Sequence, residues 1–257
     1  MSTTAGTPTR SASQAPRRLS VVATAALALA LLGIVLLALA GLGTRWGWWP
    51  FPTGFRVLGW GFYLECAAVL VGIVGAVVAR PGGGRRGFRV ALLGLVVGLV
   101  GAGVMVRWLV RARSVPPIHD ITTDVVNPPL FVAVLPLRKD AANPAAYGGQ
   151  EVAAQQQRGY PDIRPLVTPR TPEQVYPLAL DVARQMGMTI DAAVPAEGRI
   201  EATATTFWFG FKDDVVVRIS RVPEGSRVDV RSVSRVGGSD VGTNAHRVRE
   251  YLKRLQG

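Results

Sequence analysis

Cysteine is almost absent from this chain of 257 residues. Cys66 is the only one, and it lies within an apolar stretch. The C-terminal half therefore contains no thiol, which excludes a disulfide framework, a Cys-x-x-Cys redox motif and a thiolate zinc site there. We expect no cofactor.

Acidic residues and lysine are also scarce, but only in the first part of the chain. Before Ser114 there are twelve arginines, no lysine and a single acid, Glu65, which gives a net charge of +11. From Ser114 onward, 17 basic and 16 acidic residues nearly cancel. A strongly basic protein often binds nucleic acid. Because the excess charge lies outside the C-terminal half, we expect no nucleic-acid partner.

Long apolar runs fill the first part of the chain. They are Leu19–Gly41, about Val57–Ala79 and about Phe88–Val110. The first run carries no charge, and at about 1.5 Å per residue it extends roughly 34 Å, enough to cross a bilayer core. Three such runs bounded by arginines predict three transmembrane helices.

The arginines flanking these runs predict the orientation. Seven lie in the N-terminal tail and the loop between the second and third runs, and four lie on the other side. Arginine is enriched on the cytoplasmic side of membranes. The chain is therefore predicted to have a disordered cytoplasmic tail (1–18), a three-helix transmembrane region (19–113) and an extracytoplasmic domain (114–257). This layout predicts a multi-pass protein of the plasma (inner) membrane whose C-terminal domain lies outside the cytoplasm.

The first run also resembles a signal peptide, with Ala38-Leu39-Ala40 as a candidate cleavage site. Its apolar stretch exceeds the usual 7–15 residues, which favours an uncleaved anchor. Cleavage would leave the C-terminal domain on the same side. Trp46, Trp48, Trp49 and Phe51 follow this run, where an interfacial aromatic belt is expected.

Glu65 and Arg107 are charges inside the second and third runs. One interpretation is a proton or ion relay. Each lies within a few residues of the end of its run, so we favour side chains that extend to the interface. Four glycines of the third run suit close helix packing: Gly94, Gly98, Gly101 and Gly103.

The C-terminal half begins with a proline-rich segment, Ser114–Leu166. Its prolines exclude long helices, and its scattered apolar residues indicate that it packs against the rest of the domain. Leu130–Leu135 is a candidate short strand. The stretch "GGQEVAAQQQRG" is a candidate short helix.

The remainder predicts an α+β domain, a four-stranded antiparallel sheet flanked by two helices, after three N-terminal transmembrane helices. The first helix begins with a Thr171-x-x-Gln174 capping box and ends at Gly187, with a kink at Pro177. The last runs from about Thr243 to Leu255. The strands between them alternate apolar and charged residues, so we expect one face against both helices and one mixed-charge face in solvent. The strand candidates are Met188–Val194, Arg199–Phe209, Asp214–Val222 and Arg227–Val236.

A polar corner, "RSVSRVGGSDVGTNAHR", joins the last strand to the last helix. Asp240 is the natural cap of that helix, and helix N-termini also attract anions. The corner therefore either braces the fold or binds a polar or anionic ligand. Its candidate ligand-binding residues are Arg231, Ser232, Ser234, Arg235, Asp240, Asn244 and Arg247. The spacing and the Lys-Ser/Thr ending of a P-loop are missing.

Two weaker candidate sites involve acids. Asp213 and Asp214 are adjacent and could bind a divalent cation with Asp240, or serve as turn residues paired with arginine. His119 could act as a general base oriented by Asp120, or make structural hydrogen bonds. No third triad residue, Gly-x-Ser-x-Gly motif or His-Glu-x-x-His motif accompanies them.

Four stretches of the C-terminal half resemble the bacterial and plastid family catalogued as domain of unknown function 1499. They are "PPIHDITTDVVNPP", "YPDIRPL", "FWFGFKDDVVVRI" and "VDVRSVSRVGGSDVGTNAHRVREYL", which together span about Pro116–Leu252. The resemblance implies an envelope-associated domain and no particular reaction. Polar residues that belong to the family pattern are His119, Asp120, Asp213, Asp214, Arg231, Ser232, Ser234, Arg235, Asp240 and Asn244.

Three functions remain open at this point. The protein is a membrane-bound envelope protein that binds a polar or anionic ligand or a protein partner, a hydrolase that uses His119 and Asp120, or a structural scaffold. The first is favoured, and an enzyme is disfavoured.

Overall fold

The structure is a computed structural model that describes residues 18–256. The chain divides into two compact units. One comprises residues 1–38 and 57–104, and the other comprises residues 39–56 and 105–257. The predicted tail, residues 1–18, lies almost wholly outside the described residues.

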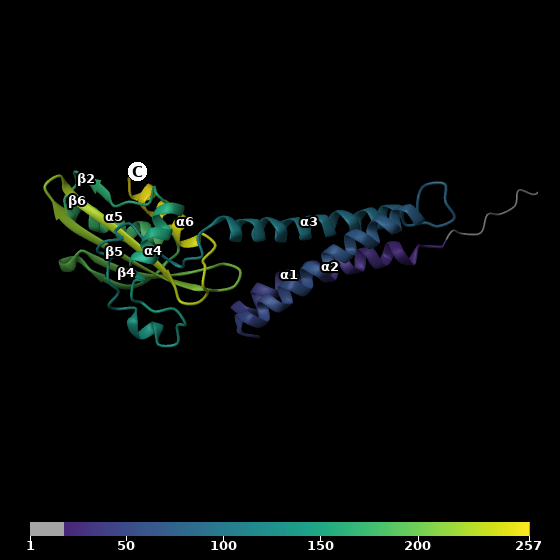
Figure 1. Ribbon diagram of the computed structural model, residues 1–257, viewed down its shortest axis with the longest axis horizontal. Coiled ribbons are helices and arrows are strands. Elements are labelled where there is room, and N and C mark those ends of the chain that lie inside the picture. Colours follow the sequence, from purple (N-terminus) through teal and green to yellow (C-terminus); the bar gives the residue numbers. More distant parts are fainter. Residues whose placement is uncertain (1–17, 257) are drawn as a thin grey trace, which may run out of the picture. The chain divides into compact units, whose positions relative to one another are not determined.

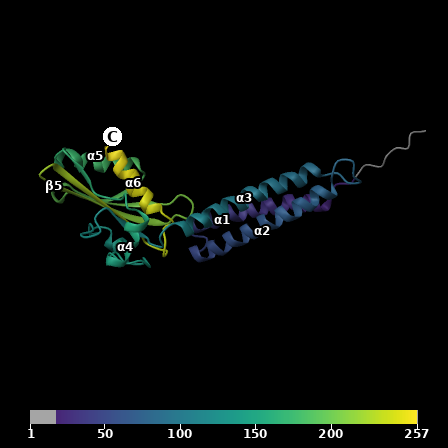
Figure 2. The same cartoon turned by 45° about the horizontal axis from the view of Figure 1, so that its top comes forward.

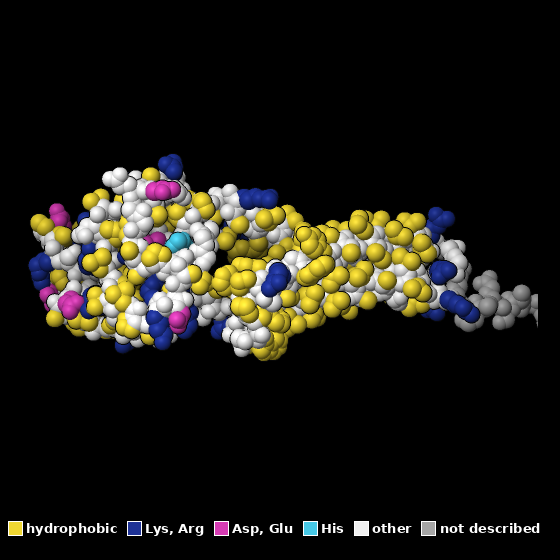
Figure 3. Space-filling view, turned by 60° about the horizontal axis from the view of Figure 1, so that its bottom comes forward, with side chains coloured by type: hydrophobic (Ala, Val, Ile, Leu, Met, Phe, Trp, Pro, Cys, Tyr) yellow, Lys and Arg dark blue, Asp and Glu magenta, His cyan; other side chains and the backbone are white. Residues whose placement is uncertain are grey.

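Three long helices are present where the apolar runs predict them: α1 (Val21–Arg45), α2 (Phe51–Val78) and α3 (Phe88–Ser114). Each is long and apolar enough to cross a membrane. Their visible surface is almost continuously hydrophobic (Figure 3). In water such a surface would be strongly unfavourable, whereas lipid tails solvate it.

Small residues let the helices of the first unit approach closely. A Cβ atom on Gly94 would lie 2.7 Å from the Ala26 backbone, so only glycine fits there. Gly98 and Gly101 likewise face neighbouring atoms of α2. A Cβ atom on Gly103 would meet no other atom within 4 Å, so our prediction that this glycine serves helix packing is wrong.

Glu65 contradicts the expectation that its side chain extends to the interface. It lies fourteen residues after Phe51 and thirteen before Val78, in the middle of α2, and is fully buried. The sequence pattern placed the start of the apolar run at Val57, whereas the helix begins six residues earlier. Arg107, in contrast, is exposed on α3.

The second unit is built on a six-stranded antiparallel sheet, two strands more than predicted (Figure 1). The order is β1-β6-β5-β4-β3, with β2 also paired to β6. The strands are β1 (Asp120–Thr122), β2 (Leu166–Thr168), β3 (Thr189–Val194), β4 (Arg199–Thr205), β5 (Lys212–Val222) and β6 (Gly225–Ser234).

One additional strand, β1, comes from the proline-rich segment, and the other, β2, begins at the last residue of that segment. β1 pairs with residues 231–233 of β6, and β2 pairs with residues 226–228 of the same edge. Together they cover an edge that would otherwise expose unpaired amides. With three residues each, they are too short to show an alternating pattern. The segment does pack against the domain, as predicted, because Ile118, Ile121 and Ile163 are buried.

Helices α5 (Pro172–Gln185) and α6 (Thr243–Gln256) cover one face of the sheet (Figure 2). Their apolar residues join Ile200, Val215 and Val230 in the main core. The predicted capping box is present, with the Thr171 amide donating to Gln174 Oε1 at 3.0 Å. Gly187 follows with a φ of +72°, the left-handed conformation that ends a helix. The α5 helix continues through Pro177.

The opposite face is not in solvent, so that prediction is wrong. Residues 124–147 cover it and place Phe131 and Val134 against Val216 and Val233 in a second apolar cluster. The candidate strand Leu130–Leu135 does not form, and a 3₁₀ turn, η1 (Leu135–Arg138), follows instead. The short helix α4 (Gly149–Gly159) forms as predicted. Two predicted strands end early, at Thr205 and Ser234.

Candidate functional site

Alternation along β6 divides the polar corner into two clusters. Ser232 and Ser234 point toward α6, because both bond to side chains of that helix. Arg231 and Arg235 point to the other face, where their partners are Asp120 and Asp214. Successive strand residues face opposite ways, so the seven candidate residues do not form one site.

The cluster on the helix side is a closed hydrogen-bond network. Ser232 Oγ donates to Asn244 Oδ1 at 2.7 Å, and Asn244 Nδ2 donates to Ser234 Oγ at 3.0 Å. Arg247 donates to Ser232 Oγ at 2.9 Å and to Asp213 Oδ2 at 2.7 Å. Arg247 is the least buried of these side chains, at 11% exposed. These polar groups are satisfied by one another, and that favours a bracing role.

Asp240 occupies the N-terminus of α6, as predicted for a cap. Its Oδ1 accepts from the Gly242 amide at 2.9 Å, and its Oδ2 accepts from the Asn244 amide at 2.6 Å. Burial raises the pKa of Asp240, and the two amide hydrogen bonds partly oppose that rise. The carboxylate already fills the place that an exogenous anion would take at this helix end.

Arg231 is the centre of the cluster on the other face, at 1% side-chain exposure. Its Nε and Nη2 donate to the two oxygens of Asp120 at 2.9 and 2.6 Å. Two backbone carbonyls of the covering segment accept further bonds. Its guanidinium also lies over the rings of Phe131 and Tyr147. Burial raises the pKa of Tyr147 to about 12. Arg231 is fully engaged within the fold and is closed to a ligand.

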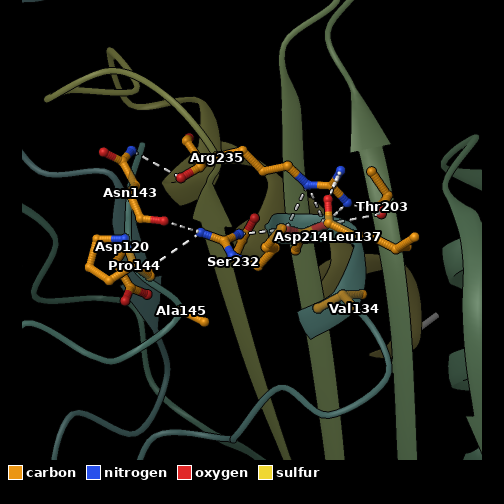
Figure 4. A network of polar contacts seen from close by, with 12 residues as sticks. Asp120, Val134, Leu137, Asn143, Pro144, Ala145, Thr203, Asp214, Ser232 and Arg235 are labelled. Atoms are coloured by element: carbon orange, nitrogen blue, oxygen red, sulfur yellow. Dashed lines mark hydrogen bonds and ion pairs between the residues drawn. The ribbon is translucent and has the colours of Figure 1, made fainter. Parts of the chain in front are cut away.

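Arg235 pairs with the carboxylate of Asp214 (Figure 4). The same carboxylate also pairs with Arg138. The Nη2 of Arg235 lies 2.7 Å from Asp214 Oδ1 and its Nε 3.0 Å from Oδ2. The Thr203 hydroxyl lies 3.0 Å from Asp214 Oδ1. The hydrogen bonds to Asp214 raise the pKa of Arg235. Two guanidinium groups on one carboxylate leave an excess positive charge here.

A hollow of about 440 Å³ opens beside Arg235. Lys139 and Lys212 line it with Arg235, and Asp191 is the only acid in its wall. Three threonine hydroxyls and two residues of η1 complete the lining: Thr189, Thr203, Thr205, Pro136 and Leu137. Both lysines are exposed and form no ion pair within residues 18–256. Of the seven candidate ligand residues, Arg235 alone lines this hollow.

The two acids proposed for a divalent cation face away from each other. Asp213 pairs with Arg247 on the helix side, whereas Asp214 pairs with Arg138 and Arg235 on the opposite side. Adjacent strand residues cannot both coordinate one ion in this arrangement. No cluster of three or more potential metal ligands occurs in the described part of the chain.

The proposed base, His119, is not oriented by its neighbour. Both carboxylate oxygens of Asp120 are bound to Arg231, and no hydrogen bond links the His119 imidazole to Asp120 among the described residues. The backbone carbonyl of His119 accepts from Asn244 instead. His246 is exposed on α6. Asp120 is therefore not placed to orient the His119 imidazole as a general base.

Sequence reasoning missed four residues that shape this region: Arg138, Lys139, Asp191 and Lys212. Arg138 and Lys139 lie in the segment whose position over the sheet was not foreseen. Lys212 begins β5 and pairs with Thr205 at the end of β4, and both residues line the hollow. The run "LRKD" after an apolar stretch was the one available signal of a basic segment.

Comparison with known proteins identifies the second unit. Residues 120–255 match the family described as "Protein of unknown function (DUF1499)". The chain belongs to the DUF1499 family. No curated protein and no solved structure matches it. The match confirms the resemblance seen in the sequence, and the DUF1499 domain includes both polar clusters and the hollow.

Proposed function

We propose that this protein is an integral membrane protein of the cell envelope whose extracytoplasmic DUF1499 domain binds a small anionic ligand in the hollow beside Arg235. The observation that carries the proposal is the composition of that hollow. Three cationic side chains line it with a single carboxylate, and the hydroxyl-bearing residues Thr189 and Thr205 also lie in its wall. Such a set suits phosphate, sulfate or carboxylate groups.

The charge balance supports an anion over a neutral ligand. Asp191 already accepts a hydrogen bond from Thr203 at 2.7 Å, and Asp214 is shared by two arginines. Lys139 and Lys212 are therefore left to attract a negative group from solvent. The buried pairs beneath would hold Arg235 in place, which limits the entropy lost on binding.

The flanking arginines support the extracytoplasmic placement. Seven arginines lie in the sequence before the first helix or between the second and third helices: Arg10, Arg17, Arg18, Arg80, Arg85, Arg86 and Arg89. Four arginines flank the opposite ends. The excess of seven over four favours a cytoplasmic N-terminus, and an odd number of spans then puts the domain outside.

A structural scaffold is the second candidate, because one specific observation favours it. Nearly every polar residue of the corner is bonded to another residue of the domain, Arg231 most completely. A domain of this kind would be stable without any ligand. The test below separates the two candidates.

The test uses the full-length protein in lipid nanodiscs with inorganic phosphate as the probe. We expect the double variant Lys139→Ala/Lys212→Ala to lose phosphate binding, measured by equilibrium dialysis, without a change in melting temperature, since both lysines are exposed. Arg235→Ala is a poorer choice, because it removes one of the two arginines that neutralise the buried Asp214 and is expected to lower stability as well. A matched control is Lys253→Ala, an exposed lysine of α6 outside the hollow.

If wild type binds phosphate no better than the double variant does, the anion site is refuted and the scaffold is favoured. If wild type and the Lys253→Ala variant bind equally and the double variant does not, the hollow is the site.

A further inference from the structure

A buried carboxyl without a partner lies at the centre of α2. Glu65 is fully buried, and neither of its carboxyl oxygens has a hydrogen-bond partner among the described residues. At about 1.5 Å per residue, it lies roughly 20 Å from either end of the helix. An interfacial role is therefore excluded for this side chain, and it requires another explanation.

Glycines on the two neighbouring helices enclose the carboxyl. A Cβ atom on Gly33 of α1 would lie 2.5 Å from Glu65 Oε1. A Cβ atom on Gly101 of α3 would lie 2.6 Å from Glu65 Cδ. Any larger residue at either position would collide with the carboxyl. The atoms nearest to the space that each of these glycines leaves all belong to the Glu65 side chain.

No positive charge faces Glu65 from the helices packed against it. Among the described residues, α1 holds no charged residue before Arg45, and α3 holds none between Arg89 and Arg107. Arg107 is exposed and lies six residues beyond Gly101.

The titratable neighbours on α2 itself do not neutralise Glu65 either. Tyr63 is exposed, Cys66 is a free thiol, and Arg56 lies nine residues earlier. An ionised carboxylate here would have neither a counter-ion nor a hydrogen-bond donor within the described residues. Both are needed in a medium of low polarity.

We infer that Glu65 is a proton-binding site inside the membrane-spanning unit. The ligand is the proton itself, which neutralises the carboxyl when the three helices are packed. Release of that proton leaves an unpaired charge between α1, α2 and α3, so loss of the proton is coupled to a change in helix packing or to penetration of water. This site is independent of the anion site proposed for the DUF1499 domain.

Infrared difference spectroscopy tests this inference on the full-length protein in lipid nanodiscs. A protonated carboxyl has a C=O stretch that is distinct from the bands of a carboxylate. We expect such a band in wild type that is absent from Glu65→Gln and that disappears reversibly between about pH 5 and about pH 10. Absence of the band throughout, or a band that never changes, would overturn the inference, since the carboxyl would be permanently ionised or permanently neutral.

A second measurement requires no variant of Glu65. An apolar carbodiimide adds across its C=N bond to the O–H of a protonated carboxyl, and every atom is retained in the adduct, which mass spectrometry locates. We expect an adduct on Glu65 whose yield falls as pH rises. Gly101→Ala, which displaces the carboxyl, should change the yield, whereas Gly103→Ala, which has open space, should not. Equal yields in these two variants would contradict the enclosed site.

Discussion

Arg231 is held by four hydrogen bonds to groups that lie up to 111 residues away in the sequence. Its burial is tolerated because Asp120 neutralises it and carbonyls accept its remaining donors. Ion pairs between residues this far apart in the sequence cannot be predicted from the spacing of residues along the chain. The sequence pattern predicted that the arginines of β6 share a face, but it could not show that a proline-rich segment would bring their partners.

Replacing Arg231 should therefore be costly. We expect Arg231→Met to lower the free energy of unfolding by about 3–5 kcal/mol, because Asp120 is left as an uncompensated buried charge. The matched control is Arg249→Ala, which breaks an exposed pair with Asp162 and should cost less than about 1 kcal/mol. Denaturant titration of both variants measures the difference. Equal losses would show that burial of the pair contributes little.

Asp240 should give stability a specific pH dependence. Burial raises its pKa in the folded domain above the ordinary value, so the folded state binds the proton more tightly than the unfolded state. Its contribution is therefore greatest at low pH and is lost as pH rises through the folded pKa, by roughly 1.4 kcal/mol for each tenfold difference in proton affinity between the two states. Relative to Asp240→Asn, wild type should become less stable over the range of pH that begins at about pH 4 and extends upward through the raised pKa of Asp240, as measured by denaturant titration. A constant difference across that range would disprove the dependence.

At the scale of the elements, a strong periodic pattern in the sequence was enough to predict a helix or strand, whereas a weak pattern was not. The long apolar runs, the capping box of α5 and the alternation of β4, β5 and β6 predicted those elements. β1 and β2 are three-residue strands defined only by the edge of β6. The segment over the charged face has no regular structure beyond a 3₁₀ turn, so no period marks it, and the face appeared to be in solvent.

Glu201 of β4 anchors that covering segment. Its carboxylate accepts hydrogen bonds from the amides of Val132, Ala133 and Val134, at 3.0–3.1 Å. We expect Glu201→Gln to increase hydrogen exchange of these amides by roughly ten- to a hundredfold, because the charged acceptor becomes neutral and one of its two acceptor oxygens is replaced by an amide nitrogen.

Glu197→Gln is the control for this variant. Glu197 and Glu201 both pair with Arg199, but Glu197 is 58% exposed and forms no hydrogen bond with the covering segment among the described residues. Exchange in the segment should stay unchanged in this control. If exchange in both variants is as slow as in wild type, the covering segment is anchored by the apolar cluster of Phe131 and Val134 instead.

At the scale of the whole molecule, the sequence predicted more about placement than about chemistry. Long apolar runs indicate three spans, and the imbalance of the flanking arginines predicts an orientation. The candidate site could not be placed from sequence, because the alternation of β6 separates residues that are adjacent in the chain, and because the lysines of the hollow come from distant segments.

Reporter fusions test the proposed orientation. Alkaline phosphatase is active only outside the cytoplasm, so we expect activity from a fusion after Gly257 and none from a fusion at Gly83, in the loop between α2 and α3. A cytoplasmic reporter such as a fluorescent protein should give the reverse pattern. Activity at Gly83 with none at Gly257 would invert the topology.

The pairing of β1 with β6 also constrains how the domain is made. Asp120 pairs with Val233, so the first strand of the domain has to wait for the last one before its hydrogen bonds can form. Contacts this distant in sequence slow folding. A chain that emerges from its N-terminus onward therefore keeps its proline-rich segment unpaired until synthesis is nearly complete. A premature stop before β6 would leave β1 and β2 unpaired and would remove the arginine partners of Asp120 and Asp213. We expect quality-control proteases to degrade such a truncated product, so that no shortened domain accumulates.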